Sequence, residues 1–486
     1  MVRALAMVLV LGLFLCSVPN EVSAEEGREA AETLAISQVS LGYQNSAAVL
    51  SDGSLWMWGA DHGDDLGGGA TDNQMLPEKI MDDVASVSLG YYHSAVIKTD
   101  GSLWTWGANS HGQLGDGTYT NHSDPVKILE DVVSVDLEVY HSAAIKADGS
   151  LWTWGCGDAG QLGNGSIGYQ TTPVKILEDV ASVSLGGDHG AALKTDGSLW
   201  AWGYNRAGQV GDGTTENKLS PVKILDDVAS VSLGRDHSAA LKKDGSLWVW
   251  GSNRYGQLGD GTTEDKLSPV KILDDVASVS LGENHSAAVK TDGSLWTWGR
   301  NTYGQLGDGT TGDKTAPVKI LEDAADVILG GQHSAVIKTD GSLWMWGGND
   351  CGQLGDGTTT NSSVPKCIAE VGFSDDDWDD GSLTSVTVYQ ASKKQYYGGT
   401  YYTKKTPAGI VQDEARDFIN AINGYLQALE TTTRDDRKNV DKDTKTSAEM
   451  LREADEATND KMITMDASLP EEAMDAVYET LAEYLV

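Results

Sequence analysis

The sequence predicts an all-β, seven-bladed β-propeller, and a fixed internal repeat is the main reason. The phrase DGSLWTWG, residues 100–107, recurs with small changes every 48 residues, and no insertion interrupts the array. A constant period indicates repeated units that share one core rather than several unrelated domains. The seven copies begin at Asp52, Asp100, Asp148, Asp196, Asp244, Asp292 and Asp340. Six histidines keep the same spacing, with Asn45 in the first unit: His93, His141, His189, His237, His285 and His333.

Each repeat unit predicts four short antiparallel strands. In the second unit, residues 84–90 (VASVSLG) alternate as a strand does, and residues 93–98 and 102–107 form two more strands around Asp100-Gly101. Asp-Gly between alternating segments is a strong signal for a tight hairpin turn. A Gly-rich loop, residues 111–118, leads to a fourth strand at residues 125–129. The unit therefore reads as a four-stranded meander.

Such a small sheet cannot bury both of its faces alone, whereas copies arranged radially share a continuous core. An open β-solenoid is the alternative, but its coils are usually shorter. Trp104 and Trp106 are two residues apart, so they project from one face of their strand toward the neighbouring blade. A fully buried Trp contributes about 4 to 6 kcal/mol gross from its buried area. We expect these tryptophans to fill the gaps between blades.

The N-terminus predicts a cleaved signal peptide over residues 1–24. Arg3 supplies a basic start, residues 4–16 are apolar, and residues 22–24 (VSA) suit cleavage before Glu25. No later apolar run approaches the roughly 20 residues of a membrane helix. We therefore expect a secreted protein, or one on the extracellular surface, with no integral membrane segment after leader removal.

The predicted propeller covers residues 36–370, and the repeat register ends there. The acidic residues 371–392 read as a linker. Residues 393–486 predict a hairpin followed by helices of unknown function. This C-terminal region is expected to form a small α+β module, to cap the propeller, to dimerise or to stay partly disordered, and the sequence leaves these alternatives open.

Charge and cysteine content exclude some classes of protein. The formal net charge is -37, and no basic cluster offsets it, so a nucleic-acid partner is not expected. Only Cys156, Cys351 and Cys367 remain after the leader, too few for a disulfide framework. Cys351 and Cys367 share a unit and are candidates for one bridge, although free thiols are the favoured expectation.

Features present in every unit are explained most simply by blade structure. The histidines suggest a metal ring, but copies on different blades lie too far apart to share an ion, so we expect structural hydrogen bonds. The Gly-Asp-Gly aspartates, such as Asp116, suit turn chemistry better than calcium binding, and Asn164 replaces one of them. No catalytic motif is present. We expect a protein that is not an enzyme and uses no metal or cofactor.

The unit, written LGxxHSAAxKxDGSLWxWGxNxxGQLGDGT followed by PVKIL, resembles the repeat of the regulator of chromosome condensation family over about residues 36–368. This resemblance implies a seven-bladed propeller. Family members include an exchange factor for a small GTPase, a plant ultraviolet-B photoreceptor and a secreted bacterial β-lactamase inhibitor. The leader argues against the first role, and the lack of Trp between Gly and His argues against the second. The secreted inhibitor is the most similar in setting.

Function is expected where the repeats differ, and the two residues between Gly and His form loops that lie together on one propeller face. Tyrosines there suit a protein-binding surface, and charged neighbours add specificity. The alternative is that exposed loop positions simply drift. The candidate partner-binding residues are Tyr43, Tyr91, Tyr92, Tyr140, Asp188, Arg235, Asp236 and Glu283. A weaker second set follows the Trp-Gly pairs: Tyr204, Tyr255 and Tyr303.

These observations predict an exported, non-enzymatic scaffold whose propeller is monomeric. Its expected role is to bind a protein partner of unknown identity through loops on one face. Two alternatives stay open: an exchange-factor-like regulator of a small GTPase, and a carbohydrate-binding surface module that uses the exposed tyrosines.

Overall fold

The computed structural model describes residues 35–61, 65–67 and 73–368. The predicted signal peptide (residues 1–24), the linker (371–392) and the C-terminal hairpin and helices (393–486) lie outside the described residues. Within the described ranges, no helix has the length and apolar character needed to cross a membrane.

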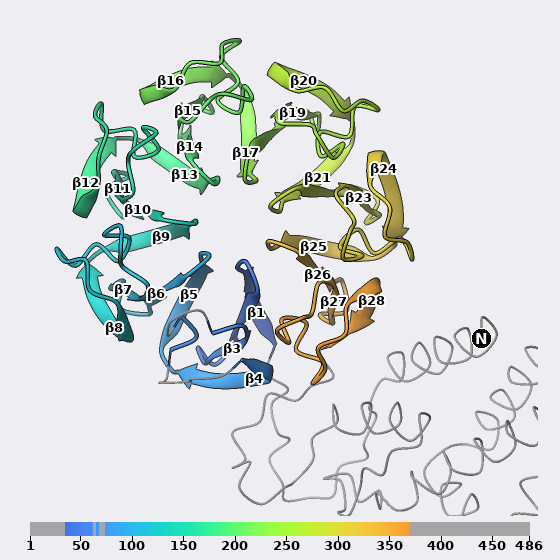
Figure 1. Ribbon diagram of the computed structural model, residues 1–486, viewed down its shortest axis with the longest axis horizontal. Helices are drawn as coiled ribbons and strands as arrows, with labels where there is room; N and C mark the ends of the chain where they lie inside the picture. Colours follow the sequence, from blue (N-terminus) through green and yellow to red (C-terminus); the bar gives the residue numbers. More distant parts are fainter. Residues whose placement is uncertain (1–34, 62–64, 68–72, 369–486) are drawn as a thin grey trace, which may run out of the picture. The chain divides into compact units, whose positions relative to one another are not determined.

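Seven four-stranded antiparallel sheets, here called blades 1 to 7, form a ring (Figure 1). Each blade is one repeat unit, and its strands follow in chain order from the ring centre outward, which confirms the predicted propeller of meanders. Blades 1 to 4 contain β1 (Ile36–Leu41), β2 (Asn45–Leu50), β3 (Leu55–Gly59), β4 (Gln74–Met81); β5 (Val84–Leu89), β6 (His93–Lys98), β7 (Leu103–Gly107), β8 (His122–Leu129); β9 (Val132–Leu137), β10 (His141–Lys146), β11 (Leu151–Gly155), β12 (Gln170–Leu177); β13 (Val180–Leu185), β14 (His189–Lys194), β15 (Leu199–Gly203) and β16 (Lys218–Leu225). Blades 5 to 7 contain β17 (Val228–Leu233), β18 (His237–Lys242), β19 (Leu247–Gly251), β20 (Lys266–Leu273); β21 (Val276–Leu281), β22 (His285–Lys290), β23 (Leu295–Gly299), β24 (Lys314–Leu321); β25 (Ala324–Leu329), β26 (His333–Lys338), β27 (Leu343–Gly347) and β28 (Ser362–Cys367).

The repeated phrase Asp-Gly-Ser-Leu-Trp builds the hairpin between the second and third strands. In blade 2, Gly101 has φ +82°, the left-handed region that glycine favours. The Asp100 carboxylate accepts hydrogen bonds from the Ser102 backbone N–H and hydroxyl, and the Ser102 hydroxyl accepts one from Trp104 Nε1. These bonds hold the pKa of Asp100 below its usual value. The same relay recurs in all seven blades.

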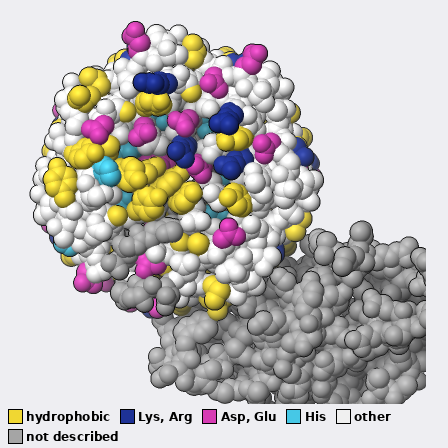
Figure 2. Space-filling view, viewed as in Figure 1, with side chains coloured by type: hydrophobic (Ala, Val, Ile, Leu, Met, Phe, Trp, Pro, Cys, Tyr) yellow, Lys and Arg dark blue, Asp and Glu magenta, His cyan; other side chains and the backbone are white. Residues whose placement is uncertain are grey.

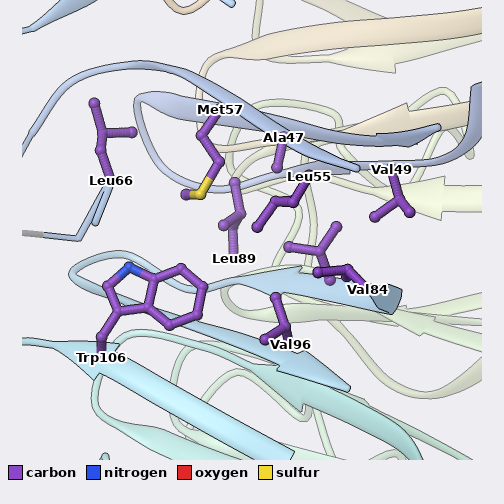
Figure 3. Packing of buried hydrophobic residues seen from close by; sticks show 10 residues of the cluster. Ala47, Val49, Leu55, Met57, Leu66, Val84, Leu89, Val96 and Trp106 are labelled. Atoms are coloured by element: carbon purple, nitrogen blue, oxygen red, sulfur yellow. The ribbon is translucent and has the colours of Figure 1, made fainter. Parts of the chain in front are cut away.

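The core lies between the blades. At the first interface, Leu66 and Met57 of blade 1 point toward Trp106 and Leu89 of blade 2 (Figure 3). Trp106 is fully buried, and Trp104 packs against the same cluster while remaining partly exposed. The prediction that both tryptophans face the neighbouring blade is confirmed. The second Trp of every pair is fully buried: Trp58, Trp106, Trp154, Trp202, Trp250, Trp298 and Trp346.

One main-chain carbonyl organises each interface. In the Gly-rich loop of blade 2, the Gln113 carbonyl accepts hydrogen bonds from Trp154 Nε1 and Ser142 Oγ of blade 3, both at 2.8 Å. A carbonyl oxygen has two lone pairs, and both are used here. Gly115, two residues later, has φ +79°, and a Cβ there would lie 2.7 Å from Trp154 Nε1. Glycine is therefore required for the indole to reach the loop.

The repeated histidine completes this contact. His93 of blade 2 is fully buried, and its Nε2 lies 2.9 Å from Ser142 Oγ of blade 3. Because that hydroxyl donates to the Gln113 carbonyl, His93 Nε2 is the donor to Ser142. The expected structural role of the histidines is confirmed here. The same bond joins His189 to Ser238, His237 to Ser286, His285 to Ser334 and His333 to Ser46.

The ring closes with these same contacts, between the last blade and the first. The Gln353 carbonyl of blade 7 accepts hydrogen bonds from Ser46 Oγ (2.8 Å) and Trp58 Nε1 (3.0 Å) of blade 1. Because no strand crosses from one blade to another, closure depends on side-chain packing and these bonds. The predicted closed ring is confirmed.

The Gly-Asp-Gly aspartates hold their own loops. Asp116 Oδ1 accepts hydrogen bonds from Asn109 Nδ2 and from the backbone N–H and hydroxyl of Thr118. Equivalent aspartates pair with a lysine, as in Asp212–Lys218 at 2.8 Å. The predicted turn role is confirmed by these bonds. Cys156 and Cys351 are free thiols, so the alternative bridge from Cys351 to Cys367 is not formed.

We predict that Ser238→Ala destabilises the propeller by about 1–3 kcal/mol, because it leaves buried His189 Nε2 without a partner. It also removes one of the two donors to the Gln209 carbonyl. The free energy of unfolding in urea measures this loss. Ser220→Ala, at an exposed position, is the matched control. Equal stability of the two variants would contradict the role given to the hydroxyl.

Acid is expected to weaken the ring through its buried histidines. Burial lowers the pKa of His93, His189 and His237 to about 3, from 6.5. A depressed folded-state pKa means that the unfolded chain binds more protons, so stability is lost as pH falls from 6.5 toward 3. Urea unfolding between pH 7 and pH 4 measures this loss. His237→Asn, which copies Asn45 of blade 1, should reduce by one the number of protons taken up on unfolding, as read from the slope of the unfolding free energy against pH. An unchanged slope would contradict the account.

Candidate functional site

The loops between the first and second strands of the blades lie near the propeller axis on one side of the ring, here called the loop face. Three of these loops carry tyrosines that contact one another. The rings of Tyr43 and Tyr91 stack with centroids 4.4 Å apart, and Tyr91 meets Tyr92 edge-on at 6.0 Å. Tyr92 and Tyr140 stack at 6.0 Å. The structure thus brings together the four tyrosines that the sequence singled out.

Two further aromatic side chains extend this row. His111, in the loop between β7 and β8, lies 4.2 Å from the Tyr140 ring, and Tyr169 lies 5.1 Å from His111. Tyr169 is 39% exposed. We call the row the aromatic track; it comprises Tyr43, Tyr91, Tyr92, Tyr140, His111 and Tyr169. It runs from the inner loops of blades 1 to 3 outward over the loops between third and fourth strands.

The sequence analysis missed His111 and Tyr169, although the repeat register contains a signal for Tyr169. Every other unit has Asn or Asp at this position, and that side chain accepts a hydrogen bond from a loop backbone N–H. In blade 2, for example, Asn121 accepts from the Asn109 N–H at 2.8 Å. Unit 3 has lost this structural residue and carries an exposed aromatic ring instead.

The charged candidates lie in the loops of blades 4 to 6. Arg235 donates to Glu283 at 2.6 Å and lies 3.8 Å from Asp236. Gln161 Nε2 donates to Asp188, and Gln209 Nε2 donates to Asp236. Burial raises the pKa of both Asp188 and Asp236. Hydrophobic side chains and basic side chains gather next to each other around the centre of this face (Figure 2).

Backbone hydrogen bonds join several loops of this face. The Gly187 N–H donates to the Arg235 carbonyl of the next blade, and the Arg235 N–H donates to the Glu283 carbonyl. Between the last blade and the first, the Gly331 N–H donates to the Gly42 carbonyl. The side chains of these loops are therefore presented on a backbone that the neighbouring blades hold in place.

The three tyrosines of the weaker candidate set, Tyr204, Tyr255 and Tyr303, differ in their contacts. Arg300 lies over the rings of Tyr255, at 5.2 Å, and Tyr303, at 6.0 Å. Arg254 also approaches Tyr255, at 5.6 Å. The faces of these two tyrosine rings therefore already interact with arginine through cation–π attraction. Tyr204 has no ring contact of this kind among the described residues.

Two acidic residues in blade 3 depart from the repeat. Asp136 stands where five of the other six units have serine, and its carboxylate accepts a hydrogen bond from the Leu185 N–H of the next blade at 2.7 Å. Glu138 stands where other units have glycine, and its Oε2 is shielded from solvent without a hydrogen-bond partner. Burial raises the pKa of Asp136 to about 7 and that of Glu138 to about 8.

The neighbouring interface is also altered. Gly190 of blade 4 stands where the other blades have serine, so among the described residues neither ring nitrogen of His141 has a side-chain hydrogen-bond partner. Blade 3 and its contact with blade 4 therefore contain several departures from the structural repeat close to the aromatic track. Within the described residues, no group of three or more His, Cys, Asp or Glu side chains is placed to hold a metal ion.

Comparison with protein families identifies the same kind of repeat. A model of the RCC1-like domain matches residues 132–387, more than half of the chain, and models of the regulator of chromosome condensation (RCC1) repeat match residues 36–63, 84–113, 52–97 and 100–145. The chain belongs to the RCC1-like family. No curated protein sequence matches this RCC1-like chain.

Solved structures place the RCC1-like chain among propellers of the same fold. Human WBSCR16 is 25% identical, with a TM-score of 0.56, and the match covers 66% of this chain and 92% of that protein. Prp20p from Saccharomyces cerevisiae is 24% identical, with a TM-score of 0.59 and coverage of 71% and 90%. Yeast RCC1 (Prp20) bound to Kap60 is 22% identical, with a TM-score of 0.59 and coverage of 72% and 91%. The two yeast matches show the fold alone.

Glu138→Gln is expected to stabilise the RCC1-like propeller increasingly as pH rises. The folded-state pKa of Glu138 is raised to about 8 from 4.5. The wild-type protein therefore loses folding stability as the pH rises from 4.5 to 8. The amide variant does not titrate and keeps its stability. Thermal midpoints at pH 5 and pH 9 measure the difference between variant and wild type. Glu178→Gln, at an exposed carboxylate paired with Lys175, is the control. A pH-independent difference for Glu138→Gln would contradict this account.

Proposed function

We propose that this RCC1-like chain is an exported, non-catalytic scaffold that binds a protein partner through its loop face. The aromatic track is the observation that carries the proposal. The Tyr and His side chains of the track are partly exposed, and Tyr169 is exposed. Such side chains offer a large contact area and lose little conformational entropy on binding. A continuous row of such rings on one face is a recognised mark of interaction sites.

The supporting structure around the track is rigid. Closed sheets and repeated interface bonds hold the loops, so the tyrosines need little reordering when a partner binds. Export is part of the proposal and rests on residues 1–24, which suit a signal peptide. The yeast structures are described as Prp20 bound to Kap60 and as a study of Prp20p binding to Gsp1p and histones. Protein binding is thus an activity recorded for propellers of this fold.

A carbohydrate is the competing ligand, because aromatic rings also stack on sugars. The exposed side chain of Asp188, which Gln161 holds by a hydrogen bond, supplies a hydrogen-bonding group of the kind such a ligand needs. Regulation of a small GTPase has only the family resemblance in its favour and requires retention in the cytosol.

The decisive variant replaces Tyr43, Tyr91, Tyr92 and Tyr140 with Ala. The wild-type chain is used to recover partner proteins from secreted and cell-surface extracts. The amount that the variant recovers should be at least tenfold lower, because aromatic residues dominate binding energy at such interfaces. Val133→Ser with Val364→Ser removes exposed apolar side chains on β9 and β28 and serves as the control. Circular dichroism checks that each variant folds.

Equal recovery by the tyrosine variant and the wild type would contradict the proposal. Extracts treated with protease or with glycosidases separate the two ligand classes. Binding that survives protease but is lost after glycosidase treatment would replace the protein partner with a carbohydrate.

A further inference from the structure

Glu138 occupies a position where the propeller normally excludes a side chain. Six other units have glycine there, and at Gly186 a Cβ would lie 2.3 Å from His189 Cε1 and 2.5 Å from the Gly234 carbonyl. A glutamate in blade 3 therefore works against the packing that the repeat requires. Departures of this kind from a structural rule gather at functional sites.

Among the described residues no cation pairs with Glu138, whose carboxyl group interacts with the Val139 main-chain N–H. Its Oε2 has no hydrogen-bond partner and no solvent exposure, while the residue as a whole is partly exposed. Nearby acidic groups add to the cost, because Asp136, Glu283 and Asp188 all raise the pKa of Glu138. Arg235, which like Glu138 interacts electrostatically with Tyr91, is already paired with Glu283 at 2.6 Å. A buried acceptor without a partner calls for an explanation.

The aromatic track reaches the loop that carries this carboxyl group, because Glu138 and Tyr140 both lie between β9 and β10. Tyr91 interacts electrostatically with Glu138, and its ring stacks on Tyr43 at 4.4 Å. A carboxylate beside aromatic faces is the combination that binds ammonium and guanidinium groups, through charge pairing and cation–π attraction. Because the described residues provide no set of three ligands for a metal ion, an organic cation is the better match.

We propose that Glu138 receives a Lys or Arg side chain from an extended segment of a protein partner, and that this segment lies along the aromatic track. The inference rests on the proposed function and adds the chemistry of the partner. Charge complementarity supports it, since the chain has a formal net charge of -37. The carboxyl group of Glu138, with its unpartnered Oε2, gives one defined point of recognition within that general attraction.

The test uses the full chain and random 12-residue peptides displayed on phage. Peptides that bind the wild type are synthesised, and their affinities are measured by fluorescence anisotropy on the wild type, on Glu138→Gln and on Glu178→Gln. The last variant removes the same charge from an exposed position. We expect selected peptides to contain Lys or Arg, and Glu138→Gln to weaken their binding at least tenfold, with Glu178→Gln unchanged.

A second exchange on the peptide isolates the contact. Replacing the basic residue with norleucine should weaken binding to the wild type at least tenfold and have little further effect on Glu138→Gln. Peptides that require the four tyrosines but bind Glu138→Gln normally would overturn this inference and leave the protein-binding face intact. Recovery of no peptide that depends on the tyrosines would count against both proposals.

Discussion

The main-chain carbonyl at the Gly-Gln-Leu-Gly turn is the group on which the rest of the structure depends. Each such carbonyl takes one hydrogen bond from a buried indole and, in most blades, a second from a serine hydroxyl of the next blade. No strand crosses between blades, so the ring is held together by these contacts, by the apolar side chains around them and by main-chain hydrogen bonds between loops of neighbouring blades. Tryptophan, serine, histidine and glycine recur at a constant period because each supplies one part of this contact.

Comparison of the repeats also identifies positions where residues that stabilise the other blades are replaced. Blade 3 carries Glu138 in place of glycine and Tyr169 in place of an asparagine or aspartate, and Gly190 withdraws the hydroxyl that His141 would bind. Each change removes a structural contact or buries a charge. Their concentration around one track of partly exposed rings is the pattern expected when a stable scaffold is adapted for binding.

The fold could be predicted from the sequence because the sequence signals for it are local and repeated. Asp-Gly turns, paired tryptophans and in-register histidines each specify a contact that the structure contains. Sequence reasoning also selected Tyr43, Tyr91, Tyr92 and Tyr140, since their positions in the register place them in neighbouring loops. It did not reveal His111, whose place beside Tyr140 depends on how a loop of blade 2 meets blade 3. Glu138 was visible as a departure from glycine, but its missing partner depends on the surrounding packing.

Hydrogen exchange of the tryptophan indole N–H groups, followed by NMR, tests the closed ring most directly. The account predicts two populations: the seven fully buried indoles exchange only on global unfolding, and the seven that bond to serine exchange faster. Trp58 is the decisive signal, because its bond to Gln353 closes the ring. Protection of Trp58 equal to that of Trp250 supports closure by identical interfaces. Much faster exchange of Trp58 than of the other six buried indoles would contradict it.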